Sequence, residues 1–547
     1  MSTTAELAAV RESEPFALRQ VRDAAATMLS EGRDDEAFEF LLSALAAVLK
    51  KSRELELLLA KMRTAGRSSE RTDSRQLALL FEELIEQLGP ETETPDPDAE
   101  LRSDAALDHE IKGLAKTREK PKREPSRSWR TQDSVERHVH EVAVPLEERP
   151  CRRCGRERRK IGEDVSRVLE YVPGHFREHE YRREKLACGR CKRGVTTARG
   201  PEKLTPKSAA DVSVVAHVVV SKYCDHTPLH RLHGIFERSG VTIPVSTLAD
   251  WTAEVADRVE PLVERIAERI IGDAYVVGTD ATGLRVLDPK SPENIQRGTI
   301  WAYVGDDRDV VFRYTPTAEG ASGPWKFLAG RQGYIQADAA GVFDRLYNGQ
   351  VASALEVGCW AHARRKFVAL QGTDSRVAYP LRLIRRLYRL EHLADLYEHK
   401  GEERAAFRQE RSQPELDKLQ RWLAGMLAQE PPSSEFAKAA NYTLRHWTAL
   451  TRFVEDGRLL LDNNGVERQL RAVALGRNNY LFAGSHDGAR RAATLYSLMR
   501  TCALHGVEPL PYLTGVLRRL ADGWGDDRLD ELLPHRWQRS RASPETG

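Results

Sequence analysis

The sequence predicts a chain of several domains in the mixed α/β class, and three observations support this. Its 547 residues exceed the size of one ordinary core, so two to four domains are expected. Hydrophobic residues make up 41% and charged residues 30%, and the mean hydropathy is −0.53, which indicates a soluble chain able to fold. Apolar residues recur with helical spacing along much of the chain, but from residue 273 they recur with the spacing of strands.

Residues 1–88 are expected to form an N-terminal helical or coiled-coil region. A helical stripe of apolar residues runs from Leu45 to Met62, and a second amphipathic segment, "SRQLALLFEELIEQL", follows a turn. A helix-turn-helix that contacts DNA or a partner and an ordinary helical hairpin both fit this pattern. Residues 89–147 are rich in Pro and in acidic and then basic residues. That composition cannot bury a core, so it predicts a charged flexible linker.

Four of the seven cysteines form two CxxC pairs separated by 33 residues, which predicts a zinc ribbon at residues 148–200. Each pair directs two thiolates to one point, and four thiolates satisfy tetrahedral Zn²⁺. The expected ligands are Cys151, Cys154, Cys188 and Cys191, with His175 and His179 as alternatives. The ion is expected to be structural, because small domains of this kind fold around their metal. Arginines beside the first pair suit contact with DNA.

Residues 201–272 predict short helices that serve either as a DNA-binding region or as a platform for the next domain. Ser246 or Thr247 is expected to cap the helix that carries Trp251.

Strands and helices alternate over residues 273–500 in the order expected of a ribonuclease H-like domain. The segments "AYVVGTDATGLRVL" and "GTIWAYVGDDRDVVFRYTP" predict three strands, the last two forming a hairpin around "GDDRD". The segments "GYIQADAAGVFDRLY" and "ALEVGCWAHARRKFVAL" each predict a strand followed by a helix. Charged helices at about 375–450 read as an insertion, and residues 501–547 as a C-terminal helical tail.

Three acidic residues are candidates for a catalytic metal site. Asp280 and Asp338 each follow an apolar strand, and Glu467 lies on a helix that begins near Asn463, with Asp462 as its cap. The acids lie 58 and then 129 residues apart. Mg²⁺ and Mn²⁺ prefer carboxylate oxygen, and two such ions can activate both oxygens of a phosphodiester exchange. Nearby acids that compete for these roles are Asp288, Asp306, Asp344 and Glu356.

Basic residues beside these acids are expected to contact DNA phosphates, although a solvated helix surface would have the same pattern. They are Arg364, Arg365, Lys366, Arg468, Arg471 and Arg477.

The segments "GCWAHARRKF" and "DNNGVERQLRAVALGRNNYLFAGS" resemble those of the transposases (TnpC type) of the insertion-sequence sixty-six family, in the DDE superfamily. The resemblance covers nearly everything after about residue 60. It implies a DNA transposase that binds terminal inverted repeats and catalyses metal-dependent strand cleavage and transfer. Asp280, Asp338 and Glu467 match the family's catalytic acids. Further implied are Mg²⁺ or Mn²⁺ beside Zn²⁺, accessory proteins of the same element, and a homo-oligomer on DNA.

The absence of a signal-peptide pattern and of a long apolar run predicts a cytoplasmic, nucleoid-associated protein without a membrane partner. The chain departs from the family pattern at Ala281, Ala339 and Ala340, and in "DNNGVER". Two alternatives therefore stay open: a nuclease that cuts without joining, and a zinc-containing DNA-binding protein whose catalytic domain is inactive.

Overall fold

The structure, a computed structural model, describes residues 96–117, 138–140, 143, 145, 149–150, 152–157, 159, 174–186, 195–198 and 210–541. It divides into two compact units. One comprises Met1–Asp108, Glu202–His233 and Ile243–Gly547, and the other His109–Pro201 and Gly234–Thr242. The N-terminal helices expected at residues 1–88 lie outside the described residues. In the part of the chain that is described, no helix is both long and apolar enough to cross a bilayer.

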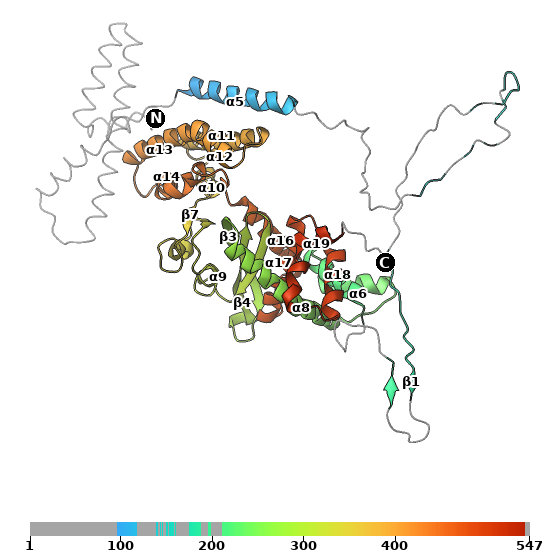
Figure 1. Cartoon of the computed structure of the whole chain (residues 1–547). Helices are drawn as coiled ribbons and strands as arrows, with labels where there is room; N and C mark the ends of the chain where they lie inside the picture. Colours follow the sequence, from blue (N-terminus) through green and yellow to red (C-terminus); the bar gives the residue numbers. More distant parts are fainter. Residues whose placement is uncertain are drawn as a thin grey trace, which may run out of the picture. The chain divides into compact units, whose positions relative to one another are not determined.

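The larger unit is built on a mixed sheet of five strands in the order β5-β4-β3-β6-β7 (Figure 1). β3 pairs antiparallel with β4, and β4 pairs antiparallel with β5, whereas β3, β6 and β7 are parallel neighbours. The strands are β3 (Val276–Leu287), β4 (Ile295–Gly305), β5 (Asp309–Thr315), β6 (Tyr334–Gln336) and β7 (Leu355–Val357). Every strand expected after residue 273 is therefore found, and the mixed α/β class is confirmed.

The predicted "GDDRD" turn joins β4 to β5. Asp306 and Asp307 both have positive φ, 49° and 54°, as tight hairpin turns require, and Asp tolerates this region better than most residues. The Asp306 carboxylate also accepts hydrogen bonds from the backbone N–H groups of Tyr275 and Val276, each at 2.9 Å. This competing acid thus has a structural partner on β3.

Helix α17 (His486–Leu504) covers the free edge of β5. Ser497 Oγ accepts a hydrogen bond from the Phe312 N–H at 2.8 Å, and Thr501 Oγ1 accepts from the N–H of Val310 while donating to its carbonyl. These hydroxyls satisfy backbone groups that an edge strand would otherwise expose, which protects the sheet from pairing with another chain.

One hydrophobic core joins the sheet to helices from both ends of the unit. The helices are α6 (Val212–Tyr223), α8 (Val245–Gly272), α16 (Asn464–Tyr480), α17, α18 (Pro509–Ala521) and α19 (Pro534–Arg541). The short α9 (Pro324–Phe327) also packs against this core. α6 and α8 pack as a platform would. In the segment expected as a C-terminal helical tail, Cys502, Tyr512 and Trp537 are among the residues that belong to this core. The predicted cap of α8 is wrong, because the helix begins at Val245 after Pro244 and no side chain caps it.

A second core lies among the helices that follow β7. They are α10 (Trp360–Val368), α11 (Ala378–Leu396), α12 (Gly401–Arg411), α13 (Gln413–Ala428), α14 (Glu435–Arg445) and α15 (Trp447–Thr451). Figure 1 shows α11 to α14 gathered in one group.

The predicted flexible linker contains a helix, α5 (Pro97–Thr117), so that prediction is wrong for these residues. Its acidic side chains pair with the nearly buried Arg386 of α11, whose guanidinium lies 2.8 Å from Glu100 and 3.0 Å from Asp104. Composition missed this helix because it is held by ion pairs more than by apolar burial.

In the smaller unit, short antiparallel pairings flank both CxxC segments. Pro150 pairs with Glu157 around the first segment, where Cys154 is exposed in a turn and Gly155 has φ +70°. β1 (Lys185–Leu186) pairs with β2 (Thr196–Thr197) on either side of the second. Cys151, Cys188 and Cys191 lie outside the described residues. α7 (Leu229–Arg238) spans the boundary between the units.

Close packing of α16 on β3 predicts different effects for two glycines of the same strand. A Cβ at Gly278 would lie 2.5 Å from Val466 Cγ2 and 2.9 Å from Asn463 Oδ1, whereas a Cβ at Gly283 would meet only a backbone oxygen at 4.0 Å. We expect Gly278→Ala to lower the free energy of unfolding by roughly 1–3 kcal/mol through overpacking. Gly283→Ala, the matched control, should change it little. Thermal denaturation of the two variants measures this, and equal melting temperatures would contradict it.

Candidate active site

Asp280 lies on β3, and Asp338 lies just beyond the end of its parallel neighbour β6. In the register of β3 and β6, Gly278 is the partner of Gln336, and each acid comes two residues later in its own chain segment. β3 is the central strand of the sheet, and β6 ends at Gln336. Because parallel neighbours advance in the same direction, the two acids lie at the same level along β3 and β6. The sequence predicted that each acid follows a strand. Asp338 does follow β6, but Asp280 lies inside β3, where it is the partner of Ala302 on β4.

Glu467 approaches these acids from the first turn of α16. Asn463, which precedes the helix and is buried, donates from Nδ2 to the Thr279 carbonyl at 2.9 Å, next to Asp280. Its carbonyl accepts the Glu467 N–H at 3.3 Å, and its own N–H lies 3.3 Å from Cys359 Sγ. Asn463 therefore ties the helix of the third acid to the strand of the first.

The predicted cap of this helix is close to what is observed. Asp462 Oδ1 accepts the Asn464 N–H at 3.0 Å, although Asn463 occupies the cap position and makes no side-chain cap bond. Val466, Leu470 and Val473 are buried as expected, whereas Ala474 is only partly buried.

The charges of Asp338 and Glu467 both act on Asp280. Burial raises the pKa of Asp280 to about 6, and the charges of Asp338 and Glu467 add to the rise, while the Ala281 N–H and Arg365 oppose it. Arg365 of α10 lies 3.1 Å from Glu467 Oε1, and His362 Nε2 lies 3.9 Å from the same oxygen. Burial and Arg365 lower the pKa of His362, so its ring is neutral at pH 7.

The donor set suits a hard divalent cation, because clustered carboxylates repel one another until a cation balances them. Among the residues that the structure describes, however, no three His, Cys, Asp or Glu side chains lie close enough to hold a metal ion. The three acids share one electrostatic neighbourhood, with Arg365 against one of them, and do not form a closed coordination shell.

The basic residues expected to contact DNA differ in their surroundings. Arg364, Arg365 and Lys366 on α10 and Arg468 and Arg471 on α16 are exposed. Arg477 is engaged with β3 instead.

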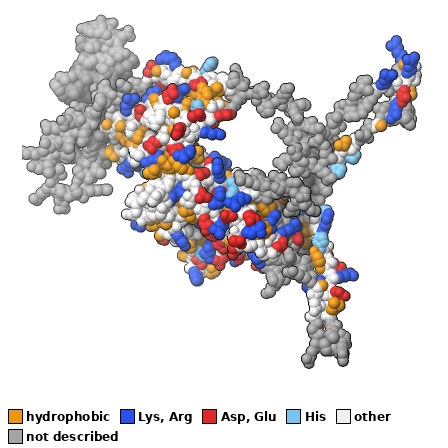
Figure 2. All heavy atoms as spheres, in the orientation of Figure 1, with side chains coloured by type: hydrophobic (Ala, Val, Ile, Leu, Met, Phe, Trp, Pro, Cys, Tyr) orange, Lys and Arg blue, Asp and Glu red, His pale blue; other side chains and the backbone are white. Residues whose placement is uncertain are grey.

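The guanidinium of Arg477 donates to Thr282 Oγ1 at 2.7 Å and to the Gly283 carbonyl. Lys366 Nζ lies 5.2 Å from the centroid of the Tyr442 ring. On the face drawn in Figure 2, Lys and Arg side chains are interspersed with Asp and Glu.

Sequence reasoning missed two residues that support the site. Asn463 was visible only as part of an Asp-Asn-Asn turn, and its bond to Thr279 spans 184 positions. Gln336 is buried and donates from Nε2 to the carbonyls of Leu460 and Gly358, which fixes the chain before α16 beside β6. A polar residue at the end of an apolar strand was the available signal for Gln336.

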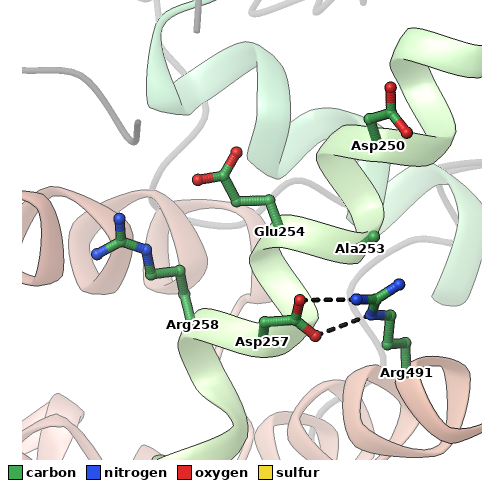
Figure 3. A pocket seen from close by; sticks show the side chains of 6 residues that line it. All are labelled: Asp250, Ala253, Glu254, Asp257, Arg258 and Arg491. Carbon is green, nitrogen blue, oxygen red and sulfur yellow. Dashed lines mark hydrogen bonds and ion pairs between the residues drawn. The ribbon is translucent and has the colours of Figure 1, made fainter. Parts of the chain in front are cut away.

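A surface hollow with a volume of about 620 Å³ lies elsewhere, between α8 and α17 (Figure 3). It contains none of the three acids. Its lining residues are Asp250, Ala253, Glu254, Asp257, Arg258 and Arg491. Arg491 neutralises Asp257 through two hydrogen bonds of 2.8 Å, which Figure 3 shows as dashed lines.

Comparison with known proteins identifies the family. A model described as "Transposase IS66 family" matches residues 207–491, one described as "IS66 C-terminal element" matches residues 497–535, and one for the "zinc-finger binding domain of transposase IS66" matches residues 148–192.

Three uncharacterized proteins of Sinorhizobium fredii (strain NBRC 101917 / NGR234) are similar over most of their length. The first, y4hP, is 33% identical over 89% of this chain and 89% of its own. The second, y4qI, is 34% identical over 76% and 78%, and the third, y4jD, is 33% identical over 73% and 80%. The matched family models, which cover the sheet with its three acids and the two CxxC segments, show that this chain belongs to the IS66 transposase family and carries that family's zinc-finger domain.

Proposed function

We propose that the chain is a DNA transposase that binds the terminal inverted repeats of its element and catalyses metal-dependent strand cleavage and strand transfer. The observation that carries this proposal is that Asp280 on β3 and Asp338 just after the parallel β6 lie at the same level of the sheet, with Glu467 near enough to raise the pKa of Asp280. Perturbed carboxylates that gather from distant segments are typical of catalytic sites.

We further propose that the core is ribonuclease H-like. Three antiparallel strands followed by two parallel ones, with the first strand at the centre, support this. An acid on the first strand and another just after the fourth support it too. The proposed organisation keeps the helical insertion at about 375–450 and the zinc ribbon at 148–200. The N-terminal region and the ribbon would recognise the element's ends.

In the proposed reaction, water attacks a phosphodiester at the element's end, and the bond to the 3′ oxygen breaks, which leaves a 3′-hydroxyl. That hydroxyl then attacks a phosphodiester of target DNA, and one P–O bond forms as another breaks. Mg²⁺ or Mn²⁺ held by Asp280, Asp338 and Glu467 would supply activation of the attacking oxygen and stabilisation of the leaving oxygen.

The chain's own residues place and balance these charges. Asn463 holds α16 against β3, and Arg365 keeps the Glu467 carboxylate in position through its 3.1 Å contact. The exposed Arg364, Lys366, Arg468 and Arg471 are proposed to contact the DNA backbone, which makes binding sensitive to salt. Arg477 is a brace of β3 in this proposal and not a DNA contact. The proposed function also includes accessory proteins of the same element and a homo-oligomer on DNA.

Neutral, nearly isosteric substitutions of the acids test the proposed chemistry. We expect Asp280→Asn, Asp338→Asn and Glu467→Gln each to reduce Mg²⁺-dependent nicking of an element end by a factor of a thousand or more, because each removes a carboxylate on which the metal depends. Binding to the same DNA, measured by mobility shift without divalent metal, should persist.

The competing acid Asp344 provides the control, since Asp344→Asn should leave nicking unchanged. Loss of DNA binding together with nicking would mean that the acids are structural. A strand-transfer assay with pre-cleaved ends separates a transposase, which joins them to target DNA, from a nuclease, which does not.

The raised pKa of Asp280 predicts a pH-dependent stability in the metal-free protein. A carboxyl with a folded pKa of about 6 and a usual pKa of 3.8 favours folding when protonated, so its contribution is present below pH 3.8 and is lost as pH rises through 6. That rise corresponds to roughly 3 kcal/mol.

Metal-free Asp280→Asn should therefore melt at a higher temperature than the wild type at pH 7.5, and the gap should narrow toward pH 4. Thermal scans over this range measure it. A wild type more stable than the variant at pH 7.5 would refute the electrostatic account.

Substitution of Cys154, the one of the four expected cysteine ligands that the structure describes, tests the zinc site. We expect Cys154→Ser to lower the zinc content of the purified protein from about one ion per chain, because three thiolates bind Zn²⁺ less tightly than four. His175→Ala should retain the metal, and its loss there would make His175 a ligand. Atomic absorption gives the zinc content of both variants. Unchanged zinc in Cys154→Ser would exclude the four-cysteine site.

A further inference from the structure

The far end of the β3–β4 hairpin carries two arginines directly opposite each other. In the register of the two strands Arg285 is the partner of Arg297, and both side chains are exposed. Directly opposed residues on one face of an antiparallel pair have their Cβ atoms about 5 Å apart, and like charges there repel. Neither arginine forms an ion pair within the described part of the chain. The hairpin thus holds two unbalanced positive charges at a fixed spacing.

The loop that follows α16 adds a third residue to this row. Ala483 pairs with Val286 as a parallel bridge, with its N–H bonded to the Arg285 carbonyl at 2.8 Å and its carbonyl to the Leu287 N–H at 2.9 Å. Val286 is buried and Ala483 packs against the same core. Because side chains alternate along a strand, Phe482 falls on the face of Arg285. Its exposed fraction of 42% agrees with this placement.

Other apolar residues border the two arginines. Leu287 is the register partner of Ile295, which is 38% exposed, and Leu481 is 64% exposed. Leu481 also has φ +65°, a left-handed conformation that a leucine rarely adopts, so the loop is held in place against a local preference. We call this surface the hairpin face: Arg285, Leu287, Ile295, Arg297, Leu481 and Phe482.

The acids near the hairpin face do not balance it. Asp288 accepts hydrogen bonds from the Lys290 N–H and from Ser291 Oγ, and it lies 3.7 Å from His486, so it is engaged in the turn. Glu293 is exposed at the tip, and the exposed Lys290 offsets its charge. The net charge of the hairpin is therefore positive, which excludes a basic partner and favours an anionic one.

We propose that the hairpin face binds a DNA strand, with Arg285 and Arg297 on phosphates and Phe482 against an unpaired base. Paired cations beside an exposed aromatic ring are the means by which proteins hold single-stranded nucleic acid, since the ring stacks on a base while the cations follow the backbone. The proposal rests on the proposed action on DNA and assigns a second contact surface to it. DNA fits better than a second copy of this chain, because the face drawn in Figure 2 mixes both signs of charge.

The test uses the full chain without divalent metal and a fluorescein-labelled duplex that carries a single-stranded end. Arg285→Thr/Arg297→Thr replaces both arginines with a residue that favours strands. We expect its affinity to fall about tenfold or more near 0.1 M salt, and the slope of log K against log salt to drop by roughly 1.4, because two phosphate contacts on a single strand are lost. The melting temperature should hold or rise, because the repulsion between the arginines is removed.

Arg313→Thr is the matched control, because Arg313 is a strand arginine of the same sheet that is already paired with Glu264 at 2.7 Å. Its affinity and salt slope should stay near those of the wild type. If both variants lost affinity equally, the loss would come from the change in net charge alone, and the proposal would be overturned.

Phe482→Ala tests the stacking contact. With 2-aminopurine in the single-stranded end, we expect wild-type binding to change the fluorescence and the variant to lose that change. An unchanged signal in Phe482→Ala, or unchanged affinity in the arginine variant, would overturn the proposal. The proposal would also be overturned if the wild type formed an oligomer without DNA and the arginine variant did not, because the hairpin face would then contact another copy of the chain. Strong binding without Mg²⁺-dependent nicking would refute the transposase chemistry and leave the hairpin face intact.

Discussion

The close approach of α16 to β3 is the contact on which the rest of the site depends. Gly278 leaves no side chain between the strand and Val466, and Asn463 crosses the remaining gap with a hydrogen bond to the Thr279 carbonyl. The acid on the strand and the acid on the helix are thereby held beside each other, although 187 positions separate them in the sequence. In the first turn of the same helix, Gly465 leaves room for the Asp307 carboxylate of the β4–β5 turn. The glycine in "DNNGVER" thus has a steric reason in this chain.

Gathering carboxylates in a partly buried place destabilises the fold, and the surroundings compensate only in part. Burial is the largest cause of the raised pKa of Asp280, and the two other acids add to it. Arg365 supplies one positive charge at 3.1 Å from Glu467, so the protein's own cation stands near the place where an added cation is proposed. Such a local loss of folding stability is expected of a site that binds a ligand, because its function requires charge that the protein itself does not balance.

The sequence was sufficient to predict the strands, but not the contacts that hold the three candidate acids near one another. Alternating apolar residues and the "GDDRD" turn located β3, β4 and β5, because these signals are local. The convergence of Asp280 and Asp338 required the parallel register of β3 and β6, which no local pattern encodes. Arg477 shows the same limit. Its position on the helix of Glu467 favoured a DNA contact, whereas its guanidinium is bonded to Thr282 of the strand. Composition also failed for α5, where ion pairs with α11 hold a helix in a segment expected to be a linker.

A net charge of +2 is small for a protein proposed to bind a polyanion. The pairing of many of its arginines with carboxylates explains how a chain of such small net charge can still bind DNA. Arg386, Arg313 and Arg491 are neutralised by carboxylates of the same chain, so they stabilise the fold and leave little field outside it. Arg285 and Arg297 lack such carboxylates among the described residues, and they are held at one spacing by the strand register. Affinity for a phosphate backbone depends on the basic side chains that are free to displace its counterions, and not on the total number of basic residues in the chain. Sites of contact are therefore to be sought where register or helix geometry leaves arginines unpaired, and the hairpin face meets that criterion more fully than the mixed surface around it.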